Sequence, residues 1–183
     1  MIAAHAIADA FSPDECDRIA SLAEAIPARD AGLVRGGHDH NQRRAEIVWL
    51  DDTPDCAWVM DRLIALVRDA NRATFGFDIT EFAESPQVAL YRGSREGHFD
   101  WHADIGDGPV ARKRKLTLVA QLSDPAGYSG GTLEIMLGAR TVTADLAHGA
   151  AVLFPSFLLH RVRPVTEGVR RSLTVWCHGP AFR

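Results

Sequence analysis

Short runs of β-type residues, separated by Gly, Asp and Pro, fill the chain from Gln87 onward, and this pattern limits the possible folds more than any other feature. About eight runs follow one another with turn residues roughly every 8 to 12 positions, a spacing typical of antiparallel sandwiches and barrels. The runs cover residues 88–91, 98–104, 116–122, 132–136, 141–143, 151–154, 160–165 and 171–177. They predict a double-stranded β-helix, or jelly roll.

The run 115–122 indicates what covers each face of such a sheet. Successive side chains of a strand point to opposite faces, so alternate residues belong together. One set is wholly apolar and the other is mixed: Leu116, Leu118, Ala120 and Leu122 against Thr117, Val119 and Gln121. The apolar face suits a layer of helices, and the mixed face suits a ligand cavity.

Two helices are predicted ahead of these strands. Ser12 and Glu15 have the spacing of a capping box, with Pro13 at the first helical position, so a helix should run from Pro13 to Ala25. Apolar residues at helical spacing predict a second helix over 58–75. The expected fold class is therefore α+β, mainly β, with a jelly-roll core and N-terminal helices packed on the outer face of a sheet.

The remaining N-terminal region contains a loop and one strand. Segment 26–41 is rich in Gly and charge and is predicted to be a loop, either a lid over a site or a plain surface segment. A strand should follow at 46–50. We expect a single domain over 1–183, with a helical support region in 1–86 and the catalytic core in 87–183.

Composition excludes several classes of partner. The chain of 183 residues has a net charge of −4, so it lacks the basic footprint that nucleic acids attract. No apolar run approaches the roughly 20 residues that span a bilayer, and the first residues lack the pattern of a secretory signal. Three scattered cysteines, Cys16, Cys56 and Cys177, suit a reducing compartment. We expect a cytoplasmic protein that binds neither nucleic acid nor membrane.

His102, Asp104 and His160 form the pattern that points to chemistry. Two histidines and one carboxylate are the facial triad of non-haem Fe(II) oxygenases, which leaves open positions for a co-substrate and dioxygen. Residues two apart on a strand share a face, so His102 and Asp104 can enter one cavity, and His160 can join them from a neighbouring strand. The sequence therefore predicts an iron site.

Arg170 follows His160 by ten residues and suits an anionic co-substrate. The last strand places one set of alternate residues on a common face: Arg170, Ser172, Thr174 and Trp176. A cation buried there needs an anion, and a guanidinium can hold a carboxylate through two hydrogen bonds. A dicarboxylic acid bound beside the metal meets this need.

The chain also resembles the Fe(II)- and 2-oxoglutarate-dependent dioxygenases of the prolyl 4-hydroxylase type, and most closely the bacterial PKHD-type hydroxylases. The segments that carry the resemblance are 91–104, 114–118, 121–125, 128–133, 154–156 and 160–173. It is strong from Tyr91 to Arg183 and looser before that, where it includes a strand from Arg43 to Trp49. These motifs are specific for the cofactor chemistry and do not indicate the substrate.

The resemblance implies the cofactors and the residues that bind them. Fe(II), 2-oxoglutarate and O2 are expected, with ascorbate as the reductant. The implied iron ligands are His102, Asp104 and His160, and Arg170 completes the catalytic set by pairing with the distal carboxylate of 2-oxoglutarate. Further co-substrate contacts are expected from four residues: Tyr91, Thr117, Gln121 and Ser172. Gln121 departs from the aromatic residue that is commoner in the family, and Arg171 stands where many relatives have Tyr.

Substrate contacts are expected from His98 and Asp100, which share strand parity with the ligands, and from Arg44. The predicted reaction is hydroxylation of an unactivated C–H bond in an amino-acid residue, prolyl-type, of a peptide or protein, or in a free amino acid. A homodimer is possible. Two other functions stay open: a non-catalytic jelly-roll sensor of metal or 2-oxoglutarate, and a cupin-like isomerase or lyase that uses Zn or Mn.

Overall fold

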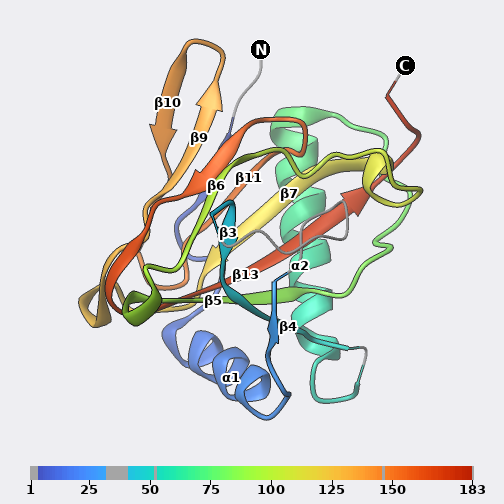
Figure 1. Ribbon diagram of the computed structural model, residues 1–183. Helices are drawn as coiled ribbons and strands as arrows, with labels where there is room; N and C mark the ends of the chain where they lie inside the picture. Colours follow the sequence, from blue (N-terminus) through green and yellow to red (C-terminus); the bar gives the residue numbers. More distant parts are fainter. Residues whose placement is uncertain (1–3, 32–40, 52, 146, 183) are drawn as a thin grey trace.

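The computed structural model describes residues 4–31, 41–51, 53–145 and 147–182, and two antiparallel sheets organise them (Figure 1). The larger sheet has the strand order β1 (His5–Ile7), β11 (Ala151–Pro155), β7 (Arg114–Gln121), β13 (Val165–His178), β5 (Gln87–Arg92), β4 (Glu46–Trp49) and β2 (Arg29–Asp30), while β8 (Tyr128–Gly130) pairs with β13. The smaller sheet has the order β10 (Arg140–Thr143), β9 (Leu133–Leu137), β12 (His160–Val162), β6 (His98–His102) and β3 (Arg43–Arg44). The expected jelly-roll core is therefore confirmed.

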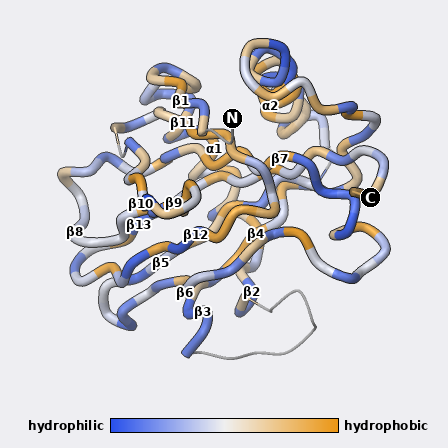
Figure 2. The backbone as a smooth tube through the Cα atoms, turned by 90° about the horizontal axis from the view of Figure 1, so that it is seen from above, coloured by the Kyte–Doolittle hydropathy of each residue, from blue (hydrophilic) through white to orange (hydrophobic). Residues whose placement is uncertain are grey.

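Two helices cover the outer face of the larger sheet, as expected. Helix α1 (Pro13–Glu24) begins at the predicted capping box, in which the Glu15 N–H donates to Ser12 Oγ at 3.2 Å and the Ser12 N–H donates to Glu15 Oε2 at 2.9 Å. Helix α2 (Ala57–Ala70) continues into a π turn, η1 (Asn71–Phe75). In Figure 2, α2 shows hydrophobic and hydrophilic colours in alternation, as a helix with one face on a core should.

The core has two parts, one on each face of the larger sheet. On the outer face, helix residues such as Ile19 and Leu63 pack against Leu118 and Leu173, all 0% exposed. On the inner face, a second cluster that includes Phe154 and Ile135 lies between the two sheets. The division of strand β7 into a helix-facing and a cavity-facing set is confirmed by these two clusters.

Strand β6 departs from simple alternation. His160 pairs with His102 and Val162 pairs with Phe99, so two steps on β12 correspond to three on β6. Such a β-bulge turns both flanking side chains to the same face. As a result Phe99 and His102 both point inward, and their ring centroids lie 3.3 Å apart. The expectation that His98 and Asp100 share parity with the ligands is wrong for this reason.

Three short strands were not expected from the sequence, β1, β2 and β8, and the strand expected over Arg43 to Trp49 is divided into β3 and β4. Region 1–86 therefore supplies strands to both sheets and is more than helical support with a loop and one strand. Three further single turns connect the strands: η2 (Gly93–Arg95), η3 (Ala111–Lys113) and η4 (Pro125–Gly127). Residues 32–40, which include most of the expected loop, lie outside the described residues. The described helices include none that is long and apolar enough to span a membrane.

Candidate active site

His102, Asp104 and His160 converge between the two sheets. His102 ends β6, Asp104 follows it by two residues, and His160 begins β12 as the cross-strand partner of His102. The Nε2 atoms of His102 and His160 lie 3.6 Å and 3.5 Å from the two carboxylate oxygens of Asp104. All three potential ligand atoms fall within 4.8 Å of one another. This arrangement can hold one metal ion.

Backbone carbonyl groups fix the orientation of both imidazoles. The Nδ1–H of His102 donates to the Asp100 carbonyl oxygen at 2.7 Å, and the Nδ1–H of His160 donates to that of Leu158 at 3.0 Å. These bonds select the tautomer whose Nε2 lone pair faces Asp104. Metal-binding histidines are oriented in the same way.

The Asp104 carboxylate is also held in place. The Thr117 hydroxyl donates to Asp104 Oδ2 at 2.7 Å and contacts the Ser156 hydroxyl at 3.0 Å. The Asp104 backbone N–H donates to the Ser156 carbonyl oxygen at 2.9 Å. Asp104 lies beyond the end of β6 and makes no strand hydrogen bonds, so these bonds hold it in position.

The protonation states suit a divalent cation. Burial, and then the neighbouring His160, lowers the pKa of His102 below its ordinary value, so its imidazole is neutral. Burial opposes ionisation of Asp104, but His160, His102 and the Thr117 hydroxyl outweigh it and keep the pKa of this carboxyl below its ordinary value. Neutral imidazole and carboxylate are the forms that bind metal, so His102 and Asp104 are in the states that fit Fe(II).

A cavity of about 280 Å³ extends from the three ligands between the sheets. Its walls come from both sheets and include aromatic, polar and charged side chains: Arg43, Ile47, Trp49, Glu84, Gln87, Ala89, Tyr91, Phe99, Arg114, Thr117, Val119, Leu133, Val162, Ser172, Thr174 and Trp176. The expected co-substrate residues Tyr91, Thr117 and Ser172 are among them. Its size is that of a small-ligand site.

Arg170 is a buried cation next to Tyr91 and is not itself among the residues that line the cavity. It is 1% exposed, and its Nε and Nη1 atoms find no hydrogen-bond partner among the described residues. The guanidinium carbon lies 5.6 Å from the ring centroid of Tyr91, its cross-strand partner. Burial lowers the pKa of Arg170, yet a guanidinium stays charged at neutral pH. Unpaired donors on a buried cation fit a carboxylate such as the distal one of 2-oxoglutarate.

Gln121 and Tyr128 complete the surroundings of Arg170. Gln121, 2% exposed, donates from Nε2 to the Tyr128 hydroxyl at 2.9 Å, and its Oε1 has no partner in the described part of the chain. Burial raises the pKa of Tyr128, although Arg170 opposes this, so the phenol keeps its proton. Tyr128 was missed from the sequence, where its position just before Ser129 and two glycines was the available signal.

Gly131 makes room for Arg170. Its φ is +67°, and a Cβ there would lie 2.8 Å from Arg170 Cδ and 2.8 Å from Val165 Cγ2. Gly131→Ala should therefore cost about 1–2 kcal/mol of stability for the left-handed backbone and should also weaken 2-oxoglutarate binding, because the Arg170 stem must move. Binding is measured by calorimetry with the metal-loaded protein.

Gly76→Ala is the matched control for this prediction. Gly76 has nearly the same φ, +66°, but a Cβ added there would meet no atom within 4 Å among the described residues. It should lose similar stability and keep its 2-oxoglutarate affinity. Equal affinities in the two variants would contradict the role of Gly131.

The structure places the three expected substrate residues away from the cavity. Both ring nitrogens of His98 contact backbone carbonyl oxygens, of Glu96 at 2.8 Å and Asn41 at 3.0 Å. Asp100 is exposed and accepts a bond from the Trp101 N–H. The β-bulge explains why the side chains of His98 and Asp100 lie outside the cavity, since it turns the side chain of Phe99, which lies between them, into the cavity.

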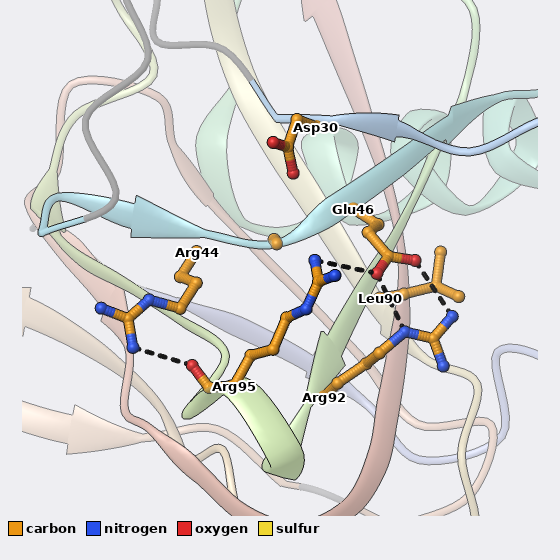
Figure 3. Close-up of a pocket in the computed structure, with 7 residues that line it drawn as sticks. Asp30, Arg44, Glu46, Leu90, Arg92 and Arg95 are labelled. Atoms are coloured by element: carbon orange, nitrogen blue, oxygen red, sulfur yellow. Dashed lines mark hydrogen bonds and ion pairs between the residues drawn. The ribbon is translucent and has the colours of Figure 1, made fainter.

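Arg44 lines a different pocket, together with Glu46, Leu90 and Arg92 (Figure 3). Its Nη1 donates to the Arg95 carbonyl oxygen at 2.9 Å. The neighbouring Arg43 has the opposite direction, because adjacent residues of a strand alternate. It lines the cavity, with its guanidinium carbon 4.5 Å from the Phe99 ring centroid and Nη2 donating to Gln87 Oε1 at 2.9 Å.

Comparisons with known proteins agree with this site. Residues 86–178 match the family model of the 2OG-Fe(II) oxygenase superfamily. A PKHD-type hydroxylase of Bordetella pertussis is 32% identical over 177 residues, which cover 93% of this chain and 76% of that protein. A PKHD-type hydroxylase of Sphingopyxis alaskensis is 36% identical over 101 residues, 51% of this chain and 45% of that protein.

Solved structures share the fold. A Pseudomonas putida prolyl-4-hydroxylase superposes with a TM-score of 0.77 at 20% identity, over 97% of this chain and 93% of that one. A prolyl hydroxylase from Trichoplax adhaerens, solved with a peptide fragment of hypoxia inducible factor, gives a TM-score of 0.80 at 20% identity, over 96% and 83%. The chain belongs to the 2OG-Fe(II) oxygenase superfamily, and its cofactors are Fe(II), 2-oxoglutarate and O2.

Proposed function

We propose that this protein is a 2-oxoglutarate-dependent dioxygenase that hydroxylates an unactivated C–H bond of an amino-acid residue, prolyl-type, in a peptide or protein, or of a free amino acid. One observation carries the proposal: three metal-binding side chains line the cavity, and Arg170, a buried cation with two nitrogens that lack partners among the described residues, lies next to the cavity-lining Tyr91. A divalent metal together with a dicarboxylic acid satisfies both. A metal alone would not explain the buried cation, and a dicarboxylic acid alone would not explain the three metal-binding side chains.

Each residue of the site has a role in this proposal. His102, Asp104 and His160 hold Fe(II), and Arg170 binds the distal carboxylate of 2-oxoglutarate. The remaining contacts to the co-substrate come from polar residues near Arg170 or near the iron ligands: Tyr91, Thr117, Gln121, Tyr128 and Ser172. When bound, Fe(II) and 2-oxoglutarate would allow O2 to act as the oxidant: one oxygen atom would enter the substrate C–H bond and the other would enter succinate, with release of carbon dioxide.

The cavity walls suit an apolar group next to the metal site. Trp49 and Trp176 line it with ring centroids 6.1 Å apart and planes at 45°. The Phe99 ring covers one side of His102. These rings exclude water from the reacting bond, and they can pack against a pyrrolidine ring or an aliphatic side chain. The structural neighbours described as prolyl hydroxylases, one of them with a bound peptide fragment, support an amino-acid residue as the substrate.

The reaction is tested by succinate formation. Protein loaded with Fe(II) without oxygen is given 2-oxoglutarate, ascorbate and air, together with proline-containing peptides or free amino acids. Succinate above the level of a His102→Ala control, with one oxygen atom gained by a substrate, is expected. Binding of iron and 2-oxoglutarate without succinate from any substrate would favour the sensor instead. Ascorbate dependence, a homodimer and a cytoplasmic location stay predictions.

A further inference from the structure

Glu84 and Arg114 form an ion pair at the wall of the cavity. Arg114 is 8% exposed and donates through Nε and Nη2 to the two carboxylate oxygens of Glu84, with 2.7 Å between Nε and Oε2. Its guanidinium carbon lies 4.1 Å from the Trp176 ring centroid. Two parallel bonds and a ring on one face leave the guanidinium little freedom to rotate.

The third donor of this guanidinium reaches a metal-binding residue. Arg114 Nη1 donates to the backbone carbonyl oxygen of Asp104 at 2.9 Å. The Asp104 backbone thus makes one hydrogen bond on each side of its Cα. Its N–H donates to the Ser156 carbonyl oxygen, and its own carbonyl oxygen accepts from Arg114. Since Asp104 has no strand ladder of its own, these two bonds set the direction of its side chain.

His178 holds Glu84 from behind. It is 0% exposed, and its Nδ1 accepts a bond from the Ala83 N–H at 3.2 Å. The proton of the ring is therefore on Nε2, which donates to Glu84 Oε2 at 3.0 Å. The backbone of His178 is fixed as well, through paired bonds with Glu81 at the end of β13.

The Glu84 carboxylate stays ionised throughout the usual pH range. Burial acts against the charge, but bonds from His178 and Arg114 outweigh it and lower the pKa of Glu84 to about 2. A charged acceptor strengthens each of these bonds relative to a neutral one. The connection from the last strand to the metal site is therefore present at any pH at which an enzyme of this type is assayed.

We infer that Glu84, Arg114 and His178 form a positioning network, which holds Asp104 in the orientation that binds Fe(II). The inference rests on the proposed function, because it takes the three-residue cluster as an iron site. In this inference the three residues act on the metal through Asp104, although Glu84 and Arg114 also line the cavity. Outer contacts to metal ligands are worth about 10–100-fold in metal affinity when they are removed.

The test uses Glu84→Gln and Co(II), whose ligand-field absorption reports the geometry of the site independently of catalysis. The amide keeps the size of the side chain but offers one acceptor oxygen where Arg114 needs two. Co(II) affinity should fall about tenfold, and the absorption spectrum of the bound metal should change. Thermal unfolding of the apoprotein is measured in parallel to separate this effect from lost stability.

Glu46→Gln is the matched control. Glu46 accepts the same two-bond contact from Arg92, at 3.0 Å for both pairs, but lines the pocket of Arg44, which contains none of the three metal ligands (Figure 3). The exposed fractions of the two carboxylate side chains are close, 21% for Glu46 and 18% for Glu84. Glu46→Gln should lower the unfolding temperature and leave Co(II) affinity and spectrum unchanged.

The outcomes separate the inference from the proposed function. If Glu84→Gln unfolds at a lower temperature but binds Co(II) as the wild type does, with the same spectrum, the network only stabilises the fold and the inference is wrong. If Glu84→Gln does not fold, Arg114→Lys gives the same comparison, because lysine keeps the charge but cannot reach Glu84 and Asp104 together. A wild type that does not bind Co(II) would instead overturn the iron site itself.

Discussion

Arg170→Met should unfold at a higher temperature than the wild type and should no longer bind 2-oxoglutarate. The side chain is 1% exposed, and two of its nitrogens lack partners among the described residues, so the empty protein bears the cost of a buried charge with incomplete hydrogen bonding. Replacement of buried charges by apolar groups of similar volume is often neutral or stabilising by about 1–4 kcal/mol. The distal carboxylate, in contrast, loses its counter-ion.

The two effects are measured in one thermal unfolding experiment, with and without co-substrate, in the presence of Mn(II). In the wild type, 2-oxoglutarate at about 100 times its Kd should add about 2.7 kcal/mol to the free energy of unfolding. Arg170→Met should show no such gain. Arg171→Met is the control, because Arg171 faces the helices and pairs with Glu24 at 2.9 Å. A co-substrate gain that survives in Arg170→Met would remove Arg170 from the site.

His160→Ala should reduce 2-oxoglutarate turnover to the level of a sample without iron. The His160 side chain is 4% exposed, and its Nε2 lies 3.5 Å from Asp104 Oδ2. Among the described residues, no other group belongs to this cluster of potential metal ligands, so none can take over as the third ligand. Loss of a contact to a ligand already costs about 10–100-fold, and loss of a ligand itself should exceed that range. Iron content after desalting and the rate of succinate formation provide the two measurements.

His98→Ala is the control for this second prediction. It removes the same kind of side chain from strand β6, where His98 contacts backbone carbonyl groups outside the cavity. Iron content and turnover should stay within about twofold of the wild type, as for most surface substitutions away from a site. Equal losses in the two variants would mean that the histidines act through the fold and not as ligands.

The long central strands could be predicted from the sequence. Strand β7 has one apolar and one mixed face over eight residues, and β13 places Arg170, Ser172, Thr174 and Trp176 on a single side. Strands that are covered on both faces must keep their alternation, because a shift of one residue would turn every side chain to the wrong layer. The positions of Thr117 and Arg170 follow from this constraint.

The bulge in β6 could not be predicted in the same way. The extra residue between Phe99 and His102 is visible only in the pairing with β12, a strand about 60 positions later in the chain. Strands β2 and β3, of two residues each, likewise form only because distant strands provide partners. The incorrect placement of His98, Asp100 and Arg44 came from these two regions, where tertiary contacts override local pattern.

Strand β13 has a consequence for which acids the protein can use as co-substrate. It carries Arg170 near its middle and His178 at its end, and it pairs with β5 over Val169–Thr174 and with β7 over Ser172–His178. A strand paired in this way cannot slide, which fixes the position of Arg170 within the larger sheet. We therefore expect the register of this sheet to select the chain length of the dicarboxylic acid, so a homologue one carbon shorter or longer should bind more weakly.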